Sequence, residues 1–415
     1  MKEELNSIED YKRHKAEKHK EMVLKQIAPY DAKVKMAMSR IREFIKDSEA
    51  RGYNNHVSVG GLDSIVLLAL IRYMGYSAAY IKAVSASHLE DKSIQQVHKE
   101  MGCIVVKPAK SKIRVLQEEG FPLLSKKIAN KVNTIANPTP ENATVRHAII
   151  TGECGEQGHY AKDSKMKLPK YVLEKYGGLD EEGRALGYQI PPKEVLLSSR
   201  CCYYLKEKPC DDWAKQHKSF PFLGLMASEG GQREDALEEN GCNYFGKTTA
   251  RSCPFSFFFH DEILHLAVDL NVHVPEIYGT IKKRPGKRHL SYNDYDHLDE
   301  KGEPTKVDYD FEIEEYYSDG EQRTGCSMCG FGIQLEKRPH RFDRLYERNP
   351  KEWDFWMNHC CRADDGTKYG WGKVLDYVGI PWRDPAHWWM KKGIDGQMSM
   401  FDYMYSQGIP EFAEE

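Results

Sequence analysis

The stretch 54–68 constrains the fold more than any other part of the 415-residue chain. A short β-type run ends in Gly60 and Gly61, and an amphipathic helix begins directly afterwards, with Asp63 and Ser64 in its first turn. Such a turn can hold phosphate, because glycine lets the backbone approach an anion and the first helical amides lack intrahelical partners. The sequence therefore predicts a nucleotide site here. The alternative is a structural Gly-Gly turn between a buried strand and a helix.

Strands and helices alternate in the residues that follow. A helix at 63–74 leads to a strand expected near 78–84. A further helix near 91–101 leads to a strand at 103–107. This alternation is typical of βαβ units and predicts a parallel sheet. Right-handed crossovers would place the Gly-Gly turn at the carboxyl edge of that sheet, where such folds bind ligands.

The turn resembles a known phosphate-binding motif. The segment Val59-Gly60-Gly61-Leu62-Asp63-Ser64 is similar to the PP-loop of ATP pyrophosphatases and phosphoadenosine phosphosulfate (PAPS) reductases, usually written Ser-Gly-Gly-x-Asp-Ser. Valine replaces the first serine and leucine the frequent lysine, which removes a hydroxyl and a cation. The resemblance implies an α/β, parallel-sheet domain of the adenine nucleotide α-hydrolase type. It also implies catalytic roles for Asp63 and Ser64. The implied nucleotide-binding residues are Ser58, Val59, Gly60, Gly61, Leu62, Asp63, Ser64 and Glu229.

A second segment resembles the same reductases. The strand-like run 220–226 is followed by Ala227-Ser228-Glu229 and then by Arg233, similar to the family's small residue, glutamate and following arginine. The resemblance implies that Glu229 binds nucleotide and that Arg233 is catalytic, because arginine can pair bidentately with phosphate. A structural salt bridge to a neighbouring carboxylate is the alternative for Arg233.

A helix expected at 260–271 and the turn that ends in Tyr278-Gly279 resemble the segment before the cysteine pair of PAPS reductase relatives. A long acidic and glycine-containing insertion follows, and it includes the basic run 282–289. A basic run beside a nucleotide site could contact the backbone of DNA or RNA. A solvated surface is the alternative.

Eleven cysteines are numerous for a chain that we expect to be cytosolic, where thiols stay reduced and some bind metal. A vicinal pair and a distant Cys-x-x-Cys supply four soft thiolates, which suit zinc or an iron–sulfur cluster. This order resembles the ligand pattern of the 4Fe-4S cluster in adenosine phosphosulfate reductases, with zinc as the second choice. Cys210 or Cys242 could replace one of the pair, and unligated thiols are the alternative. The implied ligands are Cys201, Cys202, Cys326 and Cys329.

The C-terminal part departs from the reductases. Their tail carries a nucleophilic cysteine, whereas this chain has none beyond Cys361. Cys360-Cys361 is the C-terminal candidate, and packed thiols are the expected role. Farther on, Gln397-Met398-Ser399-Met400-Phe401 resembles the peptide by which DNA-processing proteins dock on the bacterial sliding clamp. Its adjacent apolar anchors would suit a hydrophobic groove, although packing on the chain's own core is the alternative.

The charge balance excludes a strongly basic or acidic protein: 60 Lys and Arg face 63 Asp and Glu, a net charge of −3. Residues 1–25 are charged throughout and the longest apolar run is short, so we expect no signal peptide, no membrane segment and a cytoplasmic location. We expect a helical N-terminal extension over 1–50 and a PP-loop domain over 51–280, with an irregular insertion near 130–195. A cysteine-containing region with a Trp-rich subdomain and tail would cover 281–415.

The resemblance implies an enzyme that binds ATP, with Mg²⁺ as an accompanying ion. A substrate oxygen would attack the α-phosphate, and sulfur would then displace AMP, with the cluster holding or delivering sulfur from a donor protein. The sulfur acceptor would be a nucleotide or nucleic acid, as in cluster-containing tRNA thiolases and DNA-phosphorothioation enzymes. One alternative is a sulfonucleotide reductase that forms sulfite, which the missing tail cysteine disfavours. Another is a non-catalytic DNA-associated adapter with a degenerate loop, which Val59 and Leu62 favour and Asp63 and Ser64 oppose.

Overall fold

The computed structural model describes residues 8–153, 166–246, 249–321, 325–326 and 328–385. Its contacts divide the chain into two compact units. The first unit comprises residues 1–108 and 206–327, and the second comprises 109–205 and 328–415. The domain boundaries at 50 and 280 stay predictions. The units are interleaved because the chain leaves the first unit after its third strand and returns to it with a later helix.

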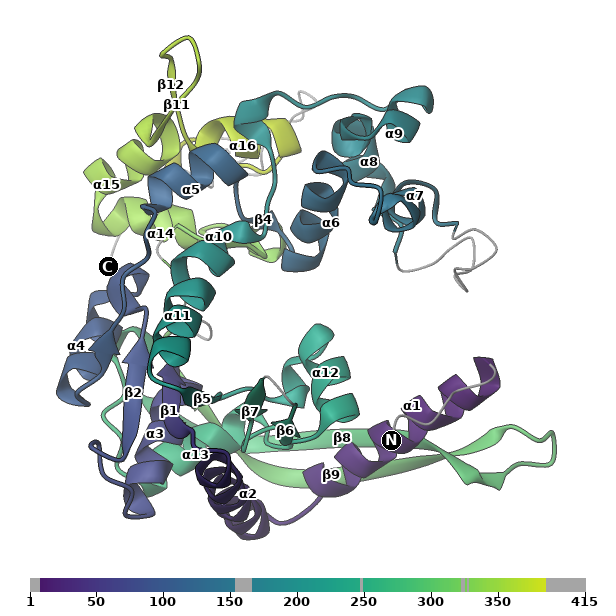
Figure 1. The fold of residues 1–415 in the computed structure, drawn as a ribbon, viewed down its shortest axis with the longest axis vertical. Helices are drawn as coiled ribbons and strands as arrows, with labels where there is room; N and C mark the ends of the chain where they lie inside the picture. Colours follow the sequence, from purple (N-terminus) through teal and green to yellow (C-terminus); the bar gives the residue numbers. More distant parts are fainter. Residues whose placement is uncertain (1–7, 154–165, 247–248, 322–324, 327, 386–415) are drawn as a thin grey trace, which may run out of the picture. The chain divides into compact units, whose positions relative to one another are not determined.

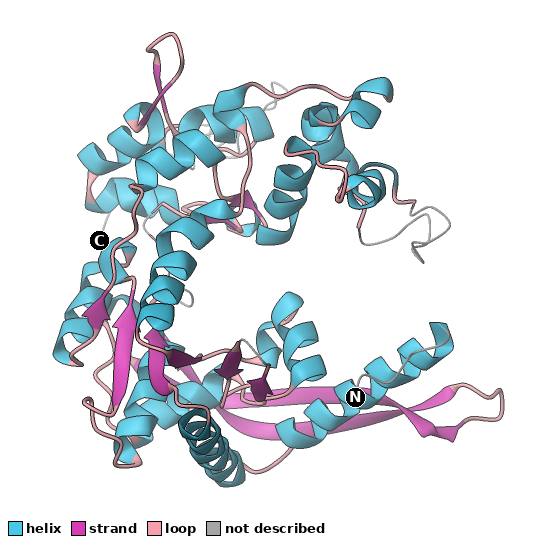
Figure 2. Cartoon of the chain, viewed as in Figure 1, coloured by secondary structure: helices cyan, strands magenta, loops and turns pink. Residues whose placement is uncertain are grey.

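A six-stranded sheet forms the centre of the first unit, in the order β3-β2-β1-β5-β7-β6 (Figures 1 and 2). Neighbouring strands are parallel, except that β6 is antiparallel to β7. The predicted mixed α/β class with a parallel sheet is therefore confirmed. The strands are β1 (Asn54–Val59), β2 (Ile81–Ser85), β3 (Ile104–Val105), β5 (Ser219–Phe222), β6 (Asn243–Phe245) and β7 (Ala250–Ser252).

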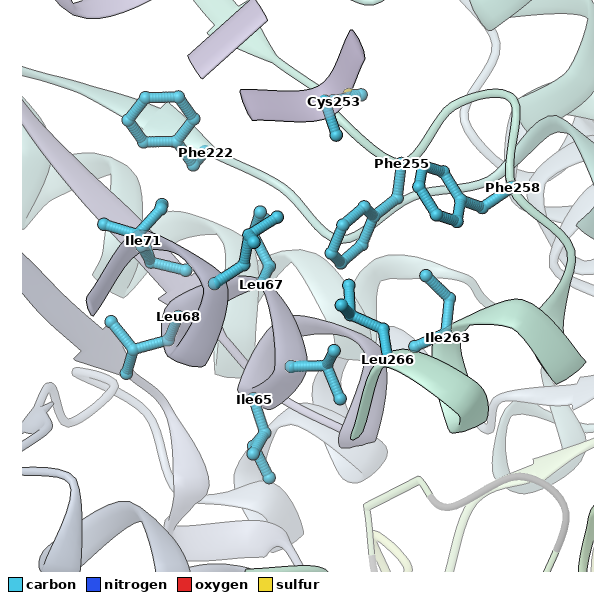
Figure 3. Close-up of a cluster of buried hydrophobic side chains, with 14 of the residues drawn as sticks. Ile65, Leu67, Leu68, Ile71, Phe222, Cys253, Phe255, Phe258, Ile263 and Leu266 are labelled. Carbon is cyan, nitrogen blue, oxygen red and sulfur yellow. The ribbon is translucent and has the colours of Figure 1, made fainter. Parts of the chain in front are cut away.

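Helix α3 (Leu62–Tyr73) lies in the main core of the first unit. It is apolar on nearly all sides rather than amphipathic as the sequence predicted, because it is buried on more than one face. In Figure 3 its side chains Ile65, Leu67, Leu68 and Ile71 lie among residues of β5, the segment after β7 and α13 (His260–Asp269). The expected helices at 63–74, 91–101 and 260–271 correspond to α3, α4 (Lys92–Glu100) and α13.

Residues 8–50 form two helices, α1 (Ile8–Gln26) and α2 (Tyr30–Ala50), which confirms the helical N-terminal region. The other longer helices of the first unit are α11 (Lys208–Gln216) and α12 (Gln232–Asn240). α1 lies along a long two-stranded hairpin of β8 (Ile281–Leu298) and β9 (Pro304–Ser318) (Figure 1).

The basic run 282–289 lies within β8, and acidic residues of β9 face it. Lys283 pairs with Glu314 at 2.9 Å and Arg284 with Glu315 at 2.6 Å. These cations are thus matched by neighbouring carboxylates, which fits the solvated-surface alternative. Contact of this run with nucleic acid remains a prediction.

The second unit is mainly helical, and Trp371 stands in its core. The indole is fully buried and contacts Phe121 and Phe342 at ring-centroid distances of 5.1 and 5.2 Å. The expected insertion near 130–195 contains short helices within this unit. The elements are α5 (Lys112–Glu119), β4 (Leu123–Leu124), α6 (Lys126–Ala136), α7 (Ala143–Thr151), α8 (Lys170–Tyr176), α9 (Glu181–Ala185), α10 (Arg200–Cys202), β10 (Gly330–Phe331), α14 (Arg341–Arg348), α15 (Pro350–Asp354), β11 (Cys361–Arg362), β12 (Lys368–Tyr369) and α16 (Trp371–Val378).

The helices of the described residues are too short or too polar to cross a bilayer.

Candidate functional site

The sheet of the first unit has a topological switch point between β1 and β5. The chain continues from β1 to β2 on one side, whereas β5 pairs with β1 on the other. Parallel sheets bind ligands in the crevice at the carboxyl ends of such strands. Gly60 follows β1 here and Leu223 follows β5, and both line a cavity of about 900 Å³. The first glycine of the predicted turn therefore lies on the wall of this cavity.

The turn holds its shape through side-chain hydrogen bonds. The amide of Gly60 donates to Ser64 Oγ at 2.7 Å, and this hydroxyl donates to the Gly61 carbonyl at 2.8 Å. The amide of Leu62 donates to the Tyr278 hydroxyl at 3.1 Å. Two amides near the turn thus already have acceptors within the protein. A phosphate at Gly60 would replace the Ser64 oxygen as the acceptor.

His98 of α4 ties the turn to the neighbouring strand. Its buried ring donates from Nε2 to the Gly60 carbonyl at 2.8 Å. In the neutral ring Nδ1 is then the acceptor for Ser85 Oγ of β2, which lies 2.9 Å away. Burial lowers the pKa of His98, in keeping with a neutral ring. Sequence reasoning missed this residue, although its spacing from Ile94 on an amphipathic helix marks it as inward-facing.

Gly224 brings the segment after β5 against the first turn of α3. A Cβ at this position would lie 2.8 Å from the Ser64 amide nitrogen and 2.9 Å from the Asp63 carbonyl carbon. Both are backbone atoms that a side chain cannot displace cheaply. Glycine is therefore required for the two segments to approach. At Gly60, by contrast, the nearest atom to an added Cβ is Ser64 Oγ at 4.0 Å.

Asp63 faces His260, and both lie at the start of a helix, α3 and α13 respectively. Asp63 Oδ1 is 3.3 Å from His260 Nδ1, close enough for an ion pair. The same oxygen is buried and accepts no hydrogen bond in the described structure, so the contact is not aligned as one. A buried carboxylate oxygen in this state fits a further donor or a cation. Its chemistry suits Mg²⁺, which takes one or two carboxylates together with substrate phosphates.

The cavity wall carries charges of both signs. Lys206 pairs with Glu90, and Cys326 and Glu90 raise the pKa of Lys206 although burial acts in the opposite direction. Lys215 and Arg251 also line the hollow. Further lining residues include Glu207, Asp211 and Lys218. Glu90, which follows β2, thus takes part in an ion pair on this wall.

Aromatic and neutral groups line the floor of the cavity above β1 and β5. Tyr53 stacks on Phe220 with ring centroids 4.1 Å apart. His56 is 1% exposed, and its Nδ1 lies 2.8 Å from Ser219 Oγ. Burial, with a smaller effect from His217, lowers the pKa of His56 to about 4. The floor therefore offers flat apolar surface beside a ring that is neutral at pH 7.

Glu229 and Arg233 pair with each other across one helical turn. The Glu229 carboxylate also accepts from the Met226 amide at 3.4 Å. This is the structural salt bridge that the sequence analysis gave as the alternative for Arg233. Nucleotide binding by Glu229 and catalysis by Arg233 stay predictions.

The predicted cluster ligands fall in both units. Cys201 and Cys202 lie in α10 of the second unit and Cys329 precedes β10, whereas Cys326 belongs to the end of the first unit. The described cysteines form no disulfide, so their thiols fit a metal centre in chemical type. The four-thiolate site stays a prediction.

The other cysteines have separate environments. Cys210 lines the cavity, and burial raises its pKa to about 11. Cys242 is buried, with its Sγ 2.9 Å from Ser256 Oγ. The Sγ atoms of Cys360 and Cys361 are buried 3.7 Å apart, in keeping with packed thiols. The clamp-like peptide from Gln397 to Phe401 lies outside the described residues.

No family model matches the chain, and no curated protein matches it.

Proposed function

We propose that the first unit binds ATP with its phosphates at the turn from Gly60 to Ser64, and that the protein adenylates a substrate oxygen in preparation for sulfur transfer. The observation that carries the proposal is the position of this turn. It follows β1 at the switch point of the sheet, and its first residue, Gly60, lines a cavity of about 900 Å³. That volume is in the range of sites for cofactors and small molecules.

The residues at the turn suit separate tasks. The Gly60 amide would bind a phosphate oxygen in place of Ser64 Oγ, while His98 holds the Gly60 carbonyl from the opposite side. Asp63 Oδ1 would bind the Mg²⁺ that accompanies ATP. Lys215 and Arg251 on the wall would offset negative phosphate charge.

The chemistry has two displacements. In the first, a substrate oxygen forms a bond to the α-phosphorus, the bond to the bridging oxygen breaks, and pyrophosphate leaves. In the second, a reduced sulfur nucleophile from a donor forms a bond to the substrate atom that carries the adenylated oxygen, the bond between that atom and the oxygen breaks, and AMP leaves with the oxygen. Arg233 would act on the phosphates after releasing Glu229.

A cluster held by Cys201, Cys202, Cys326 and Cys329 would supply sulfur-binding or redox chemistry. The acceptor in this proposal is a nucleotide or nucleic acid, with a sulfur donor protein as partner.

Calorimetric titration of the full chain with Mg-ATP tests the binding step. Gly60→Ala adds a methyl group on the cavity wall without backbone strain or a close contact, so we expect an unchanged melting temperature. The methyl group would lie where the phosphate must approach, and we expect affinity to fall by tenfold or more, equivalent to about 1.4 kcal/mol.

Asp63→Asn tests the metal ligand, and Asp31→Asn is a matched control because Asp31 is also acidic and in the first turn of a helix of the same unit. We expect only Asp63→Asn to weaken the dependence of ATP binding on Mg²⁺. Equal ATP affinity in Gly60→Ala and the unmodified chain would contradict the proposed site. With oligonucleotide acceptors, ATP–pyrophosphate exchange would support adenylation.

The adapter alternative has one observation in its favour: the amides of Gly60 and Leu62 already have protein acceptors. Absence of ATP binding and of exchange would support it. Thiol-dependent release of sulfite from PAPS would support the reductase alternative instead.

A further inference from the structure

The facing sides of α1 and α12 are oppositely charged. Lys15 Nζ lies 2.9 Å from Asp235 Oδ1, and His14 Nε2 lies 3.2 Å from Glu239 Oε2. These are exposed pairs of one cation and one carboxylate, and pairs of this kind contribute little to stability. The group formed around His19 differs from them in both composition and burial.

Three ligand-type side chains converge at His19. Its ring, Glu234 and Glu238 each offer an atom, and these atoms all lie within 4.8 Å of one another. Glu238 is only 8% exposed, although it carries a carboxylate. His19 Nδ1 lies 2.6 Å from Glu238 Oε1. The cluster is therefore compact and partly withdrawn from water.

The hydrogen bond of His19 Nε2 determines whether Nδ1 can act as a metal ligand. Nε2 lies 3.1 Å from the Ser291 carbonyl of β8, to which it donates. In the neutral ring Nδ1 then presents a lone pair toward the carboxylates. A histidine that binds a metal commonly donates its other N–H to a carbonyl in this way, which fixes the tautomer and the ring orientation.

Glu234 and Glu238 are four residues apart on α12, where like charges repel each other. Within the described residues, the Glu234 carboxylate has no hydrogen bond or salt bridge that would offset this repulsion. The ring nitrogen and the two carboxylates are thus three electron-pair donors around one point. A single proton can join only two of them, whereas a divalent cation can be bound by all three.

We propose that His19 Nδ1, Glu234 and Glu238 bind a divalent transition-metal ion of the zinc class. One imidazole and two carboxylates, without a thiolate, suit Zn²⁺, with water completing the coordination. The ion links α1 to α12, and the Ser291 contact extends the link to β8. The proposal is independent of the nucleotide cavity and of the cysteine ligands.

A proton competes with the metal for His19, since the hydrogen bond to Glu238 raises the pKa of the ring. The test is therefore made at pH 8. The full chain is titrated anaerobically with Co²⁺, and Zn²⁺ is then added to displace it. Co²⁺ on nitrogen and oxygen ligands gives weak visible bands, whereas Co²⁺ on thiolates adds strong near-ultraviolet absorption. The two kinds of site are thus separated in one titration.

His19→Gln and Glu234→Gln are the test variants, and His14→Gln is the matched control on the same pair of helices. Glu234→Gln removes a ligand without breaking a described bond, so the test remains valid even if His19→Gln disturbs folding. We expect the thiolate-free Co²⁺ signal in the unmodified chain and in His14→Gln, and a loss of affinity of tenfold or more in both test variants.

The proposal is overturned if the unmodified chain gives no thiolate-free signal, or if the test variants bind Co²⁺ as tightly as the control. In either case the cluster holds only a proton.

Discussion

At the scale of single residues, two buried histidines support the candidate site. His98 holds the Gly60 carbonyl, and His56 lies under the cavity against Ser219. Among the described residues, neither ring has a carboxylate as a hydrogen-bond partner. Their burial therefore disfavours the charged form, and both residues have a lowered pKa.

His56 should make stability depend on pH. Its pKa is about 4 in the folded chain, against an ordinary value of 6.5. Between these values the unfolded chain binds a proton that the folded chain does not, so the free energy of unfolding falls as the pH is lowered. The loss from this residue reaches about 3 kcal/mol at pH 4.

His56→Gln keeps a polar partner for Ser219 and removes the titration. Denaturant unfolding at pH 7 and pH 4 should show a smaller loss of stability in the variant than in the unmodified chain. An equal loss in both proteins would show that His56 is not the group responsible.

At the scale of elements, a buried ion pair joins α2 to α13. Lys33 Nζ contacts both carboxylate oxygens of Glu262, at 2.7 and 2.9 Å, and Lys33 is fully buried. Arg288 of β8 reaches the same carboxylate at 3.2 Å and also binds Asp261. Burial lowers the pKa of Lys33, because the charged form is costly away from water.

Removing one partner of this ion pair should lower the free energy of unfolding more than removing both partners. Glu262→Leu leaves the Lys33 ammonium buried without its carboxylate, and we expect a loss of about 3–5 kcal/mol in the free energy of unfolding. Adding Lys33→Met should recover much of that loss, since Arg288 keeps Asp261 as a partner. Denaturant unfolding of both single variants and the double variant measures the coupling. If the losses of unfolding free energy in the two single variants add up in the double variant, Lys33 and Glu262 are not coupled.

The cysteine prediction concerns the whole molecule, because its four ligands are divided between the two units. Protein purified without oxygen should contain iron and absorb visible light, and chelation should remove both. Cys326→Ser should lower the iron content, whereas Cys103→Ser serves as a control outside the predicted ligand set. If the purified protein contains zinc and no iron, the four thiolates hold zinc, the second choice of metal. Full iron content in Cys326→Ser would exclude this ligand.

Much of the first unit could be predicted because its signals are local. The apolar run from Ile65 to Ile71 and the glycines before it defined β1, the turn and α3. Because a strand is followed by a helix and then by another strand, the sequence also predicted that β1, β2 and β3 pair in parallel. The β8–β9 hairpin was missed because charged residues dominate both strands, so an apolar–polar alternation is weak.

The rest of the site depends on contacts between distant segments. Nothing near Tyr278 indicates that its hydroxyl accepts from Leu62, and Gly224 shows its importance only when packed against Ser64. The division into interleaved units was also beyond local patterns, because the second unit is assembled from two separate stretches.

The hydrogen bond from Gly60 to Ser64 Oγ has a consequence for the energetics of recognition. If a phosphate binds as proposed, its oxygen would take the place of the Ser64 hydroxyl, and the amide would exchange one acceptor for another. The fold already holds this N–H in one direction, so the proposed ligand would need a rotation of the Ser64 side chain and no rearrangement of the turn.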